Sequence, residues 1–235
     1  MMSKETNIMT QDKPDHGEYK HSFMLNGKEL YFRKWRVKDR IALERAEGQS
    51  AVRQCLVYNC LEDKSIALDD YEYQYVLIKL RQASVGDDIR YNFVCNSCHE
   101  RFDHDSHLTD TMEPIHATYE PIITDRYRIE LGEVPNRKAY EDVIFGLNDI
   151  TERKIADMVM HIRSINGNLK LGYKDIMDVF SEMDVDEFQE IWNQWNQVHF
   201  RINRIHEVTC PHCGSTMLIE FDDLPGFFPE KWNMQ

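Results

Sequence analysis

Two pairs of cysteines constrain the fold of this chain more than any other feature of its sequence. The pairs are Cys95-Asn-Ser-Cys98 and Cys210-Pro-His-Cys213. Each follows an apolar run and precedes a turn and a second strand-like run, so the pattern strand, C-x-x-C knuckle, strand occurs twice. Four thiolates fill the tetrahedral shell of a structural zinc ion, and the two-residue spacing lets both thiolates of a knuckle face one ion. We therefore predict a structural Zn²⁺ bound by Cys95, Cys98, Cys210 and Cys213.

The distance between the two pairs along the chain is unusual for a zinc ribbon. Residues 99–209 separate them, so the predicted ion ties the middle of the chain to its end. Closing so long a loop limits the entropy of the unfolded chain, and zinc binding adds folding free energy of its own. Four histidines near the knuckles could replace a ligand, although a solvated strand-edge position is their ordinary role: His99, His104, His206 and His212.

The cysteines have two other interpretations. They could be ordinary reduced thiols, as we expect for Cys55 and Cys60, which read as buried small hydrophobes in a helix-like segment. They could also be redox-active, since Cys-Pro-His-Cys matches the active site of a thiol oxidase of the thioredoxin class, where a helix N-terminus lowers the pKa of the first thiol. Here Gly214-Ser215 leads into a strand-like run near the end of the sequence. We interpret the redox match as a coincidence.

Composition and charge argue against several classes of function. The chain has 235 residues, of which 42% are hydrophobic, enough for one substantial core or two small ones. Its net charge of −13 is repelled by phosphate backbones, so we expect no nucleic-acid partner. No apolar run approaches a membrane span, and Met1 to Lys20 lacks the apolar region of a signal peptide. Reduced, metal-type cysteines then favour cytoplasmic synthesis.

No motif for catalysis is found. The sequence lacks G-x-x-x-x-G-K-[ST], G-x-S-x-G and H-E-x-x-H. A zinc ion with four cysteine ligands has no open position for a substrate. The acidic pairs Asp87-Asp88 and Asp222-Asp223 are more typical of turns and caps than of an acid–base dyad. We therefore predict a protein without enzymatic activity.

Periodicity and turn residues predict a mixture of strands and helices. A hairpin is expected over His21 to Phe32, around an Asn26-Gly27 turn. Two further strand-like runs, Thr118 to Ile123 and Tyr127 to Leu131, follow the first knuckle. Helices are predicted over seven ranges: 37–46, 50–61, 69–82, 137–146, 151–164, 173–180 and 184–204.

The last predicted helix carries one apolar stripe. Its members recur at spacings of three and four: Val185, Phe188, Trp192, Trp195, His199 and Ile202. This stripe could be a groove for a partner, but a face turned toward the core is the more common role of such a pattern.

The predicted fold class is α+β. It combines an N-terminal β-hairpin and helices, a split four-cysteine zinc-ribbon-like module and an inserted, mainly helical domain. The expected divisions are a flexible tail (1–18), hairpin and helices (19–86), first knuckle (87–110), helical insert (111–205), second knuckle (206–223) and C-terminal aromatic tail (224–235). That last segment contains Phe227, Phe228 and Trp232, which could pack on their own domain or bind a partner.

Three segments, in this order, carry a resemblance to a known family. They are Leu30-Tyr-Phe-Arg-Lys-Trp-Arg-Val-Lys-Asp-Arg40, then Leu68-Asp-Asp-Tyr-Glu-Tyr73 leading to Leu80-Arg-Gln-Ala-Ser-Val-Gly86, then the first knuckle directly after that glycine. Together they resemble the baseplate hub subunit family of contractile-tailed, T-even-like bacteriophages. Lys34 stands where that family tends to carry proline, and Asp39-Arg40 stands in place of an acidic pair.

The resemblance implies a structural or assembly protein of the tail baseplate hub, made in the host cytoplasm. Its partners would be other hub proteins and the tape measure protein. Independently of the resemblance, the large aromatic side chains near the terminus predict a contact surface that includes Phe227, Phe228 and Trp232. The alternatives are a zinc-ribbon adaptor that binds transcription machinery through protein contacts, and a thiol–disulfide oxidoreductase. A basic face on the folded protein would favour the adaptor, and a helix directly after Cys210 would favour the oxidoreductase.

Overall fold

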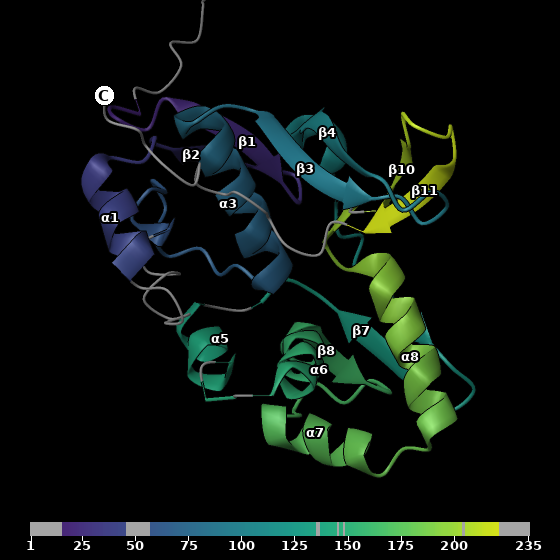
Figure 1. The fold of residues 1–235 in the computed structure, drawn as a ribbon. Helices are drawn as coiled ribbons and strands as arrows, with labels where there is room; N and C mark the ends of the chain where they lie inside the picture. The colour runs from purple at the N-terminus through teal and green to yellow at the C-terminus, as the bar shows by residue number, and fades with distance from the viewer. Residues whose placement is uncertain are drawn as a thin grey trace, which may run out of the picture.

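The structure is a computed structural model, and it describes residues 16–45, 57–134, 137–144, 146–147, 149–203 and 205–220. Within these residues the fold is a mixture of helices and small antiparallel sheets, which confirms the predicted α+β class. In Figure 1 the N-terminal hairpin, α3 and the knuckle hairpins occupy the upper half, and α5 to α8 with the sheet that contains β7 and β8 occupy the lower half. The helices are α1 (Val37–Arg45), α3 (Asp70–Ser84), α4 (Leu108–Thr111), α5 (Arg137–Ile144), α6 (Ile150–His161), α7 (Tyr173–Ser181) and α8 (Val185–Val198).

Five antiparallel sheets contain the described strands. Four of them are two-stranded, and β6, β7 and β8 form a sheet of three. The strands are β1 (His21–Leu25), β2 (Lys28–Phe32), β3 (Asp88–Val94), β4 (Arg101–His107), β5 (Glu113–Ile115), β6 (Ile122–Ile123), β7 (Arg128–Leu131), β8 (Ile162–Ile165), β9 (Arg201–Asn203), β10 (Ile205–Thr209) and β11 (Thr216–Glu220). Because β5 pairs with β9, the chain before the helical region meets the chain after it.

The N-terminal hairpin forms where the sequence predicts it. Strands β1 and β2 pair in register from His21↔Phe32 to Leu25↔Lys28. Asn26 and Gly27 have φ of 46° and 78°, the left-handed values that a two-residue type I′ turn requires at both positions. Before the hairpin, His16 stacks on Tyr31 with ring centroids 3.4 Å apart. The end of the predicted N-terminal tail thus contacts the hairpin.

The first core lies between this hairpin and α3. Asp69 caps α3 by accepting hydrogen bonds from the amides of Tyr71 and Glu72, and the Glu72 carboxylate in turn accepts from the Asp69 amide. Phe200 and Ile202, which follow α8 in the chain, are also buried in this core. The buried ion pair of Arg33 and Asp39 (2.6 Å) lies within the first of the segments that carry the family resemblance.

The second core is built by the helical region. The sheet β6–β7–β8 packs with α6, α7 and α8 around Ile129, Met158, Ile191 and Trp195, all nearly or fully buried. A smaller cluster joins α5 to α6 through Tyr140, Ile144 and Ala156.

Three predicted elements begin or end at other residues in the structure. The strand predicted from Thr118 begins only at Ile122, because the amides of Thr118 and Tyr119 both bond to the carbonyl of Val198 and Tyr119 has φ of 51°. The helix predicted to Ser164 ends at His161, since β8 pairs with β7 there. The helix predicted to Arg204 ends at Val198, and the following residues pair as β9 with β5.

Two other sequence predictions need correction or fall outside the described residues. Val185 is 82% exposed and does not belong to a buried stripe on α8, whereas Ile191, which the prediction omitted, is fully buried. Most of the helix predicted over 50–61 lies outside the described residues, and at its end Leu61 forms an isolated bridge to Phe32 instead.

Candidate metal centre

The two knuckles have the same backbone geometry. In the first, the amide of Cys95 donates to the carbonyl of Glu100 and the amide of His99 donates to the carbonyl of Cys95. In the second, the amide of Cys210 donates to Ser215 and that of Gly214 to Cys210. The fourth residue after each first cysteine is left-handed, with φ of 61° at His99 and 71° at Gly214. Each turn joins two paired strands, β3 to β4 and β10 to β11.

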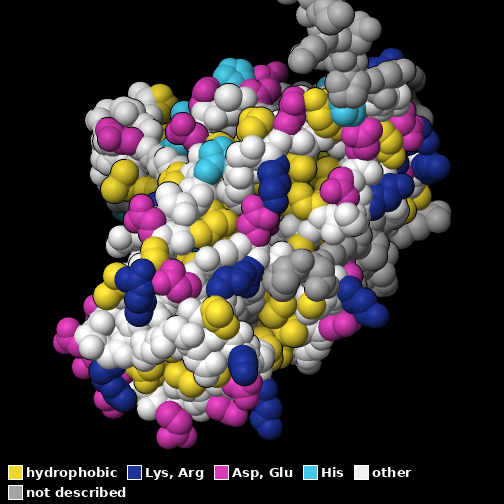
Figure 2. Space-filling model, turned by 180° about the vertical axis from the view of Figure 1, so that it is seen from behind, with side chains coloured by type: hydrophobic (Ala, Val, Ile, Leu, Met, Phe, Trp, Pro, Cys, Tyr) yellow, Lys and Arg dark blue, Asp and Glu magenta, His cyan; other side chains and the backbone are white. Residues whose placement is uncertain are grey.

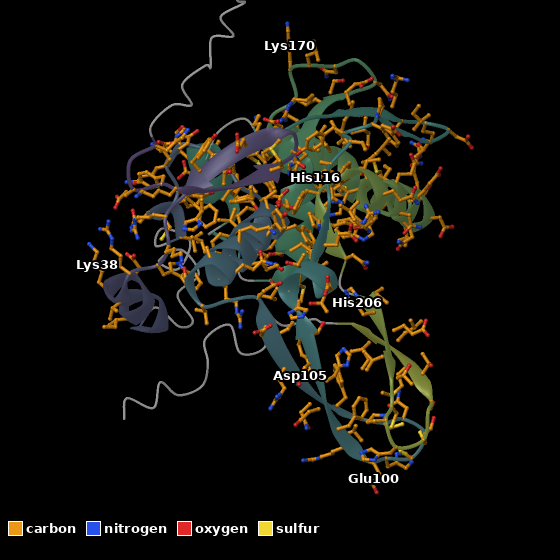
Figure 3. The ribbon with its side chains drawn as sticks, turned by 90° about the horizontal axis from the view of Figure 1, so that it is seen from above. Lys38, Glu100, Asp105, His116, Lys170 and His206 are labelled. Carbon is orange, nitrogen blue, oxygen red and sulfur yellow. The ribbon has the colours of Figure 1, made fainter. Side chains whose placement is uncertain are left out.

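These turns bring all four predicted cysteines together. Every pair of their Sγ atoms lies within 4.8 Å. The Sγ atoms of Cys95 and Cys213 are 3.6 Å apart, and those of Cys98 and Cys210 are 3.8 Å apart. Figure 3 shows the two hairpins lying side by side and projecting from the rest of the chain, with Glu100 at their tip.

The sulfur positions fit a tetrahedral ion. Thiolates at about 2.3 Å from a zinc ion lie about 3.8 Å from one another at the corners of a tetrahedron. The two distances above agree with this spacing. No disulfide joins the described cysteines.

Backbone hydrogen bonds favour the thiolate form of Cys95. The amides of Cys98 and Ser97 donate to the sulfur of Cys95, and these bonds lower the pKa of that thiol to about 6. Thiolates rather than thiols bind metal ions. In contrast, burial raises the pKa of Cys60 to about 11, and Cys60 lies in the first core, as expected for a small hydrophobe.

The cluster has little apolar cover of its own. Three buried side chains surround it, Phe102, Val208 and Met217, with Phe93 and Ile219 partly buried beside them. Three polar contacts also join the two hairpins, from Ser97 Oγ to Ser215 Oγ (2.8 Å), from the His212 ring to the carbonyl of Arg101 (3.3 Å) and from the Asn96 amide to Met217 Sδ (3.3 Å). The two hairpins therefore meet through the four sulfur atoms, a small apolar cluster and these few polar contacts.

The neighbouring histidines have other roles. His206 Nε2 lies 2.7 Å from the carbonyl of Thr111, and His212 contacts Arg101 as described above. Within the described residues, the metal-capable group at this place contains the four cysteines alone, without His99, His104, His206 or His212.

A second metal-capable group lies elsewhere, and sequence analysis missed it. Asp69, Asp157 and His161 are all buried, and their ligand atoms lie within 4.8 Å of one another. Burial, with the nearby Asp69 carboxylate, raises the pKa of Asp157 to about 8. Burial alone would lower the pKa of His161, but the carboxylates of Asp69 and Asp157 raise it. Asp157 and His161 are four residues apart, a spacing that places both on one face of a helix and could have signalled the group.

Comparison with known proteins identifies the family. The family described as T4 bacteriophage base plate protein matches residues 17–229, a span that includes both knuckles. The chain belongs to this family. Neither the curated proteins nor the solved structures contain a match. Membership gives the chain a structural role in the phage tail baseplate, with other phage tail proteins as its partners.

Among the residues that the structure describes, no helix has the length and apolar character of a membrane span. Phe227, Phe228 and Trp232, which we predict to contact a partner, lie outside the described residues.

Proposed function

We propose that this baseplate protein belongs to the hub of the tail, where it acts as a structural or assembly subunit through protein contacts, without enzymatic activity. The observation that carries the proposal is the family match over residues 17–229. The order of the three sequence segments that resemble hub subunits supports the finer assignment to the hub. Synthesis in the host cytoplasm and assembly into the virion tail follow from that role.

We further propose that Cys95, Cys98, Cys210 and Cys213 hold a structural Zn²⁺. The spacing of their sulfur atoms and the twice-used knuckle support this. A bound zinc ion would supply a rigid, closed cross-link rather than a reactive centre. The cysteines would then fix β10 and β11 against β3 and β4, and so fix the start of the C-terminal segment.

The proposed contact surface is the aromatic tail. Phe227, Phe228 and Trp232 follow β11 within a short stretch that contains Pro225 and Pro229. Large aromatic side chains carry much of the binding energy at protein interfaces, and prolines reduce the entropy lost on docking. Other hub proteins are the proposed partners, and the tape measure protein stays a prediction.

Truncation tests this function. A chain that lacks residues 225–235 should keep the melting temperature of the full chain but lose co-purification with tail proteins from infected cells, as measured by mass spectrometry. A chain that lacks only residues 233–235 retains Trp232 and serves as the control. Binding that survives the longer truncation, or unfolding caused by it, would remove the tail as the docking element. Co-purification with no tail protein by the full chain would contradict the hub role.

The two alternatives lack the features that would favour them. Cys210 is followed by a turn and then by β11, whereas a thioredoxin-like oxidoreductase needs a helix there. On the face drawn in Figure 2, acidic side chains are interspersed among the basic ones. The net charge of −13 also opposes binding to nucleic acid.

A further inference from the structure

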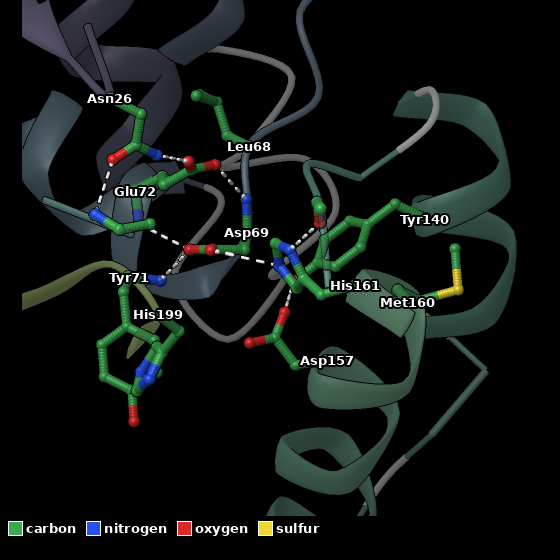
Figure 4. A network of polar contacts seen from close by, with 12 residues as sticks. Asn26, Leu68, Asp69, Tyr71, Glu72, Tyr140, Asp157, Met160, His161 and His199 are labelled. Atoms are coloured by element: carbon green, nitrogen blue, oxygen red, sulfur yellow. Dashed lines mark hydrogen bonds and ion pairs between the residues drawn. The ribbon is translucent and has the colours of Figure 1, made fainter. Parts of the chain in front are cut away.

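The buried group of Asp69, Asp157 and His161 lies where the two main cores meet. Asp69 caps α3 in the first core, whereas Asp157 and His161 belong to α6 in the second. Figure 4 shows the three side chains converging between these helices. The exposed fractions are 0%, 3% and 1% for Asp69, Asp157 and His161. Charged groups are rarely buried so completely unless they are paired or bind a metal ion.

Hydrogen bonds orient each of the three side chains. His161 Nδ1 lies 2.9 Å from the carbonyl of Gly132 and can only donate to it, so the hydrogen bond leaves Nε2 facing the carboxylates. The Asp69 oxygen Oδ1 accepts from the amides of Tyr71 and Glu72, which leaves Oδ2 free to face His161. Tyr140 donates to Asp157 Oδ1 at 2.7 Å. Histidines and carboxylates that bind metal ions are typically oriented in this way by a second layer of hydrogen bonds.

Two of the converging atoms have no hydrogen-bond partner. Both Asp69 Oδ2 and His161 Nε2 are buried and lack one. They lie 3.4 Å apart, which is longer than the about 2.7–2.9 Å of a hydrogen bond between a charged nitrogen donor and a carboxylate. A simple His⁺–Asp⁻ ion pair would close to that shorter distance. It would also give the second carboxyl group, Asp157, no ion-pair partner among the described residues, with the Tyr140 hydroxyl as its hydrogen-bond donor.

A divalent cation resolves both problems. Two carboxylates and a neutral imidazole balance the charge of one such ion. Nitrogen and oxygen ligands at about 2.1 Å from a tetrahedral zinc ion lie about 3.4 Å apart, which is the separation seen here. We propose that Asp69, Asp157 and His161 bind a second divalent cation, best matched to Zn²⁺, at the junction of α3 and α6.

The site has access to solvent on one side. A cavity of about 600 Å³ is lined by Asp157 together with Asp70, Arg153 and His199. An ion could reach the Asp157 carboxylate from this cavity, and water from it could complete the coordination shell. The bound ion would join the first core directly to the second core. The four cysteines lie elsewhere and do not contribute to this junction.

Metal content of the purified full-length protein tests the proposal. After saturation with Zn²⁺ and removal of excess ion, elemental analysis should find two zinc ions per chain. Asp157→Asn and His161→Gln should each lose one of the two. Asp70→Asn serves as the matched control, because it makes the same chemical change beside the site, at a carboxylate paired with Arg153 rather than with His161. This control should keep both ions.

Substitution with Co²⁺ separates the two sites. Thiolate-to-cobalt charge-transfer absorption reports the cysteine cluster alone, and it should be unchanged in Asp157→Asn. A wild-type protein that holds a single zinc ion, lost on substitution of the cysteines, would overturn the second site, and this result does not depend on any variant of the site folding. Retention of two ions by a folded Asp157→Asn protein would also overturn it.

Discussion

The four-cysteine cluster and the buried group of Asp69, Asp157 and His161 hold their parts of the molecule together in different ways. The cysteines lie at the tip of two thin hairpins, with Cys213 exposed and few apolar neighbours. The buried group lies between two large cores, each of which packs without it. We therefore expect the hairpins to depend on the proposed zinc cross-link for their mutual position, whereas the junction of α3 and α6 has independent support from packing.

The largest effect is therefore expected at the cysteines. Cys98→Ser should abolish zinc binding at the cluster and lower the melting temperature by about 10 °C or more, because a structural zinc ion contributes much of the folding free energy of small metal-linked modules. Elemental analysis measures the zinc content, and thermal unfolding followed by circular dichroism measures the melting temperature. Asn96→Ser, at an exposed position in the same knuckle, is the control and should behave as wild type.

Two outcomes would contradict the expectation that the hairpins depend on the cysteines more than the junction depends on its buried group. If Cys98→Ser loses its metal but unfolds at the wild-type temperature, the hairpins hold their position through other contacts, such as Ser97 with Ser215. If Asp157→Asn is destabilised more than Cys98→Ser, the junction rather than the hairpin module is the part that depends on its polar cluster.

The same contrast explains what the sequence could predict. Each knuckle is encoded within six residues, and its spacing and turn residues suffice to predict the site even though the partner knuckle is 111 residues away. The Asn26-Gly27 turn and the Asp69 cap are similarly local. The buried group was harder to find, since only Asp157 and His161 are close in sequence and the approach of Asp69 to α6 depends on tertiary packing.

The C-terminal ends of two helices were predicted wrongly, because the chain after each helix pairs as a strand. Ile162–Ile165 and Arg201–Asn203 continue a helical pattern in the sequence, but β8 pairs with β7 and β9 pairs with β5. Such long-range pairings override local propensity. Val185 fits the apolar spacing of its helix and is nevertheless exposed, because it lies at the first position of α8.

An intermediate effect is expected at Asn26, which connects the hairpin to the junction. Its Nδ2 donates to Glu72 Oε1 at 2.6 Å, its Oδ1 accepts from the amide of Ala117, and Glu72 in turn accepts from the amide of Asp69. Asn26→Ala should lower the free energy of unfolding by about 2–3 kcal/mol, since it removes the donor to Oε1 of the buried Glu72 and places alanine at a left-handed position. Chemical denaturation measures this loss.

Two further variants separate the contribution of the Asn26 hydrogen bonds from that of its turn conformation. Asn26→Gly keeps the left-handed turn but removes the side chain, so a loss close to that of alanine would assign the effect to the hydrogen bonds. Ser22→Ala removes an exposed hydroxyl contact with Glu29 in the same hairpin and should be nearly neutral. A neutral Asn26→Gly would instead show that turn conformation alone matters, and that the hairpin does not support the junction through Glu72.

The smallest effect is expected at Arg90 and Asp105, a cross-strand ion pair on the outer face of the first knuckle hairpin. The two side chains are 67% and 70% exposed, and their closest atoms are 2.6 Å apart. Exposed pairs of this kind are screened by solvent and salt, and they contribute little to stability. Asp105→Asn should leave the melting temperature within about 2 °C of wild type and leave the zinc content of the cysteine cluster unchanged. A fall comparable to that of Cys98→Ser would mean that the outer ladder of the β3–β4 hairpin, rather than the sulfur cluster at its tip, holds this module in place.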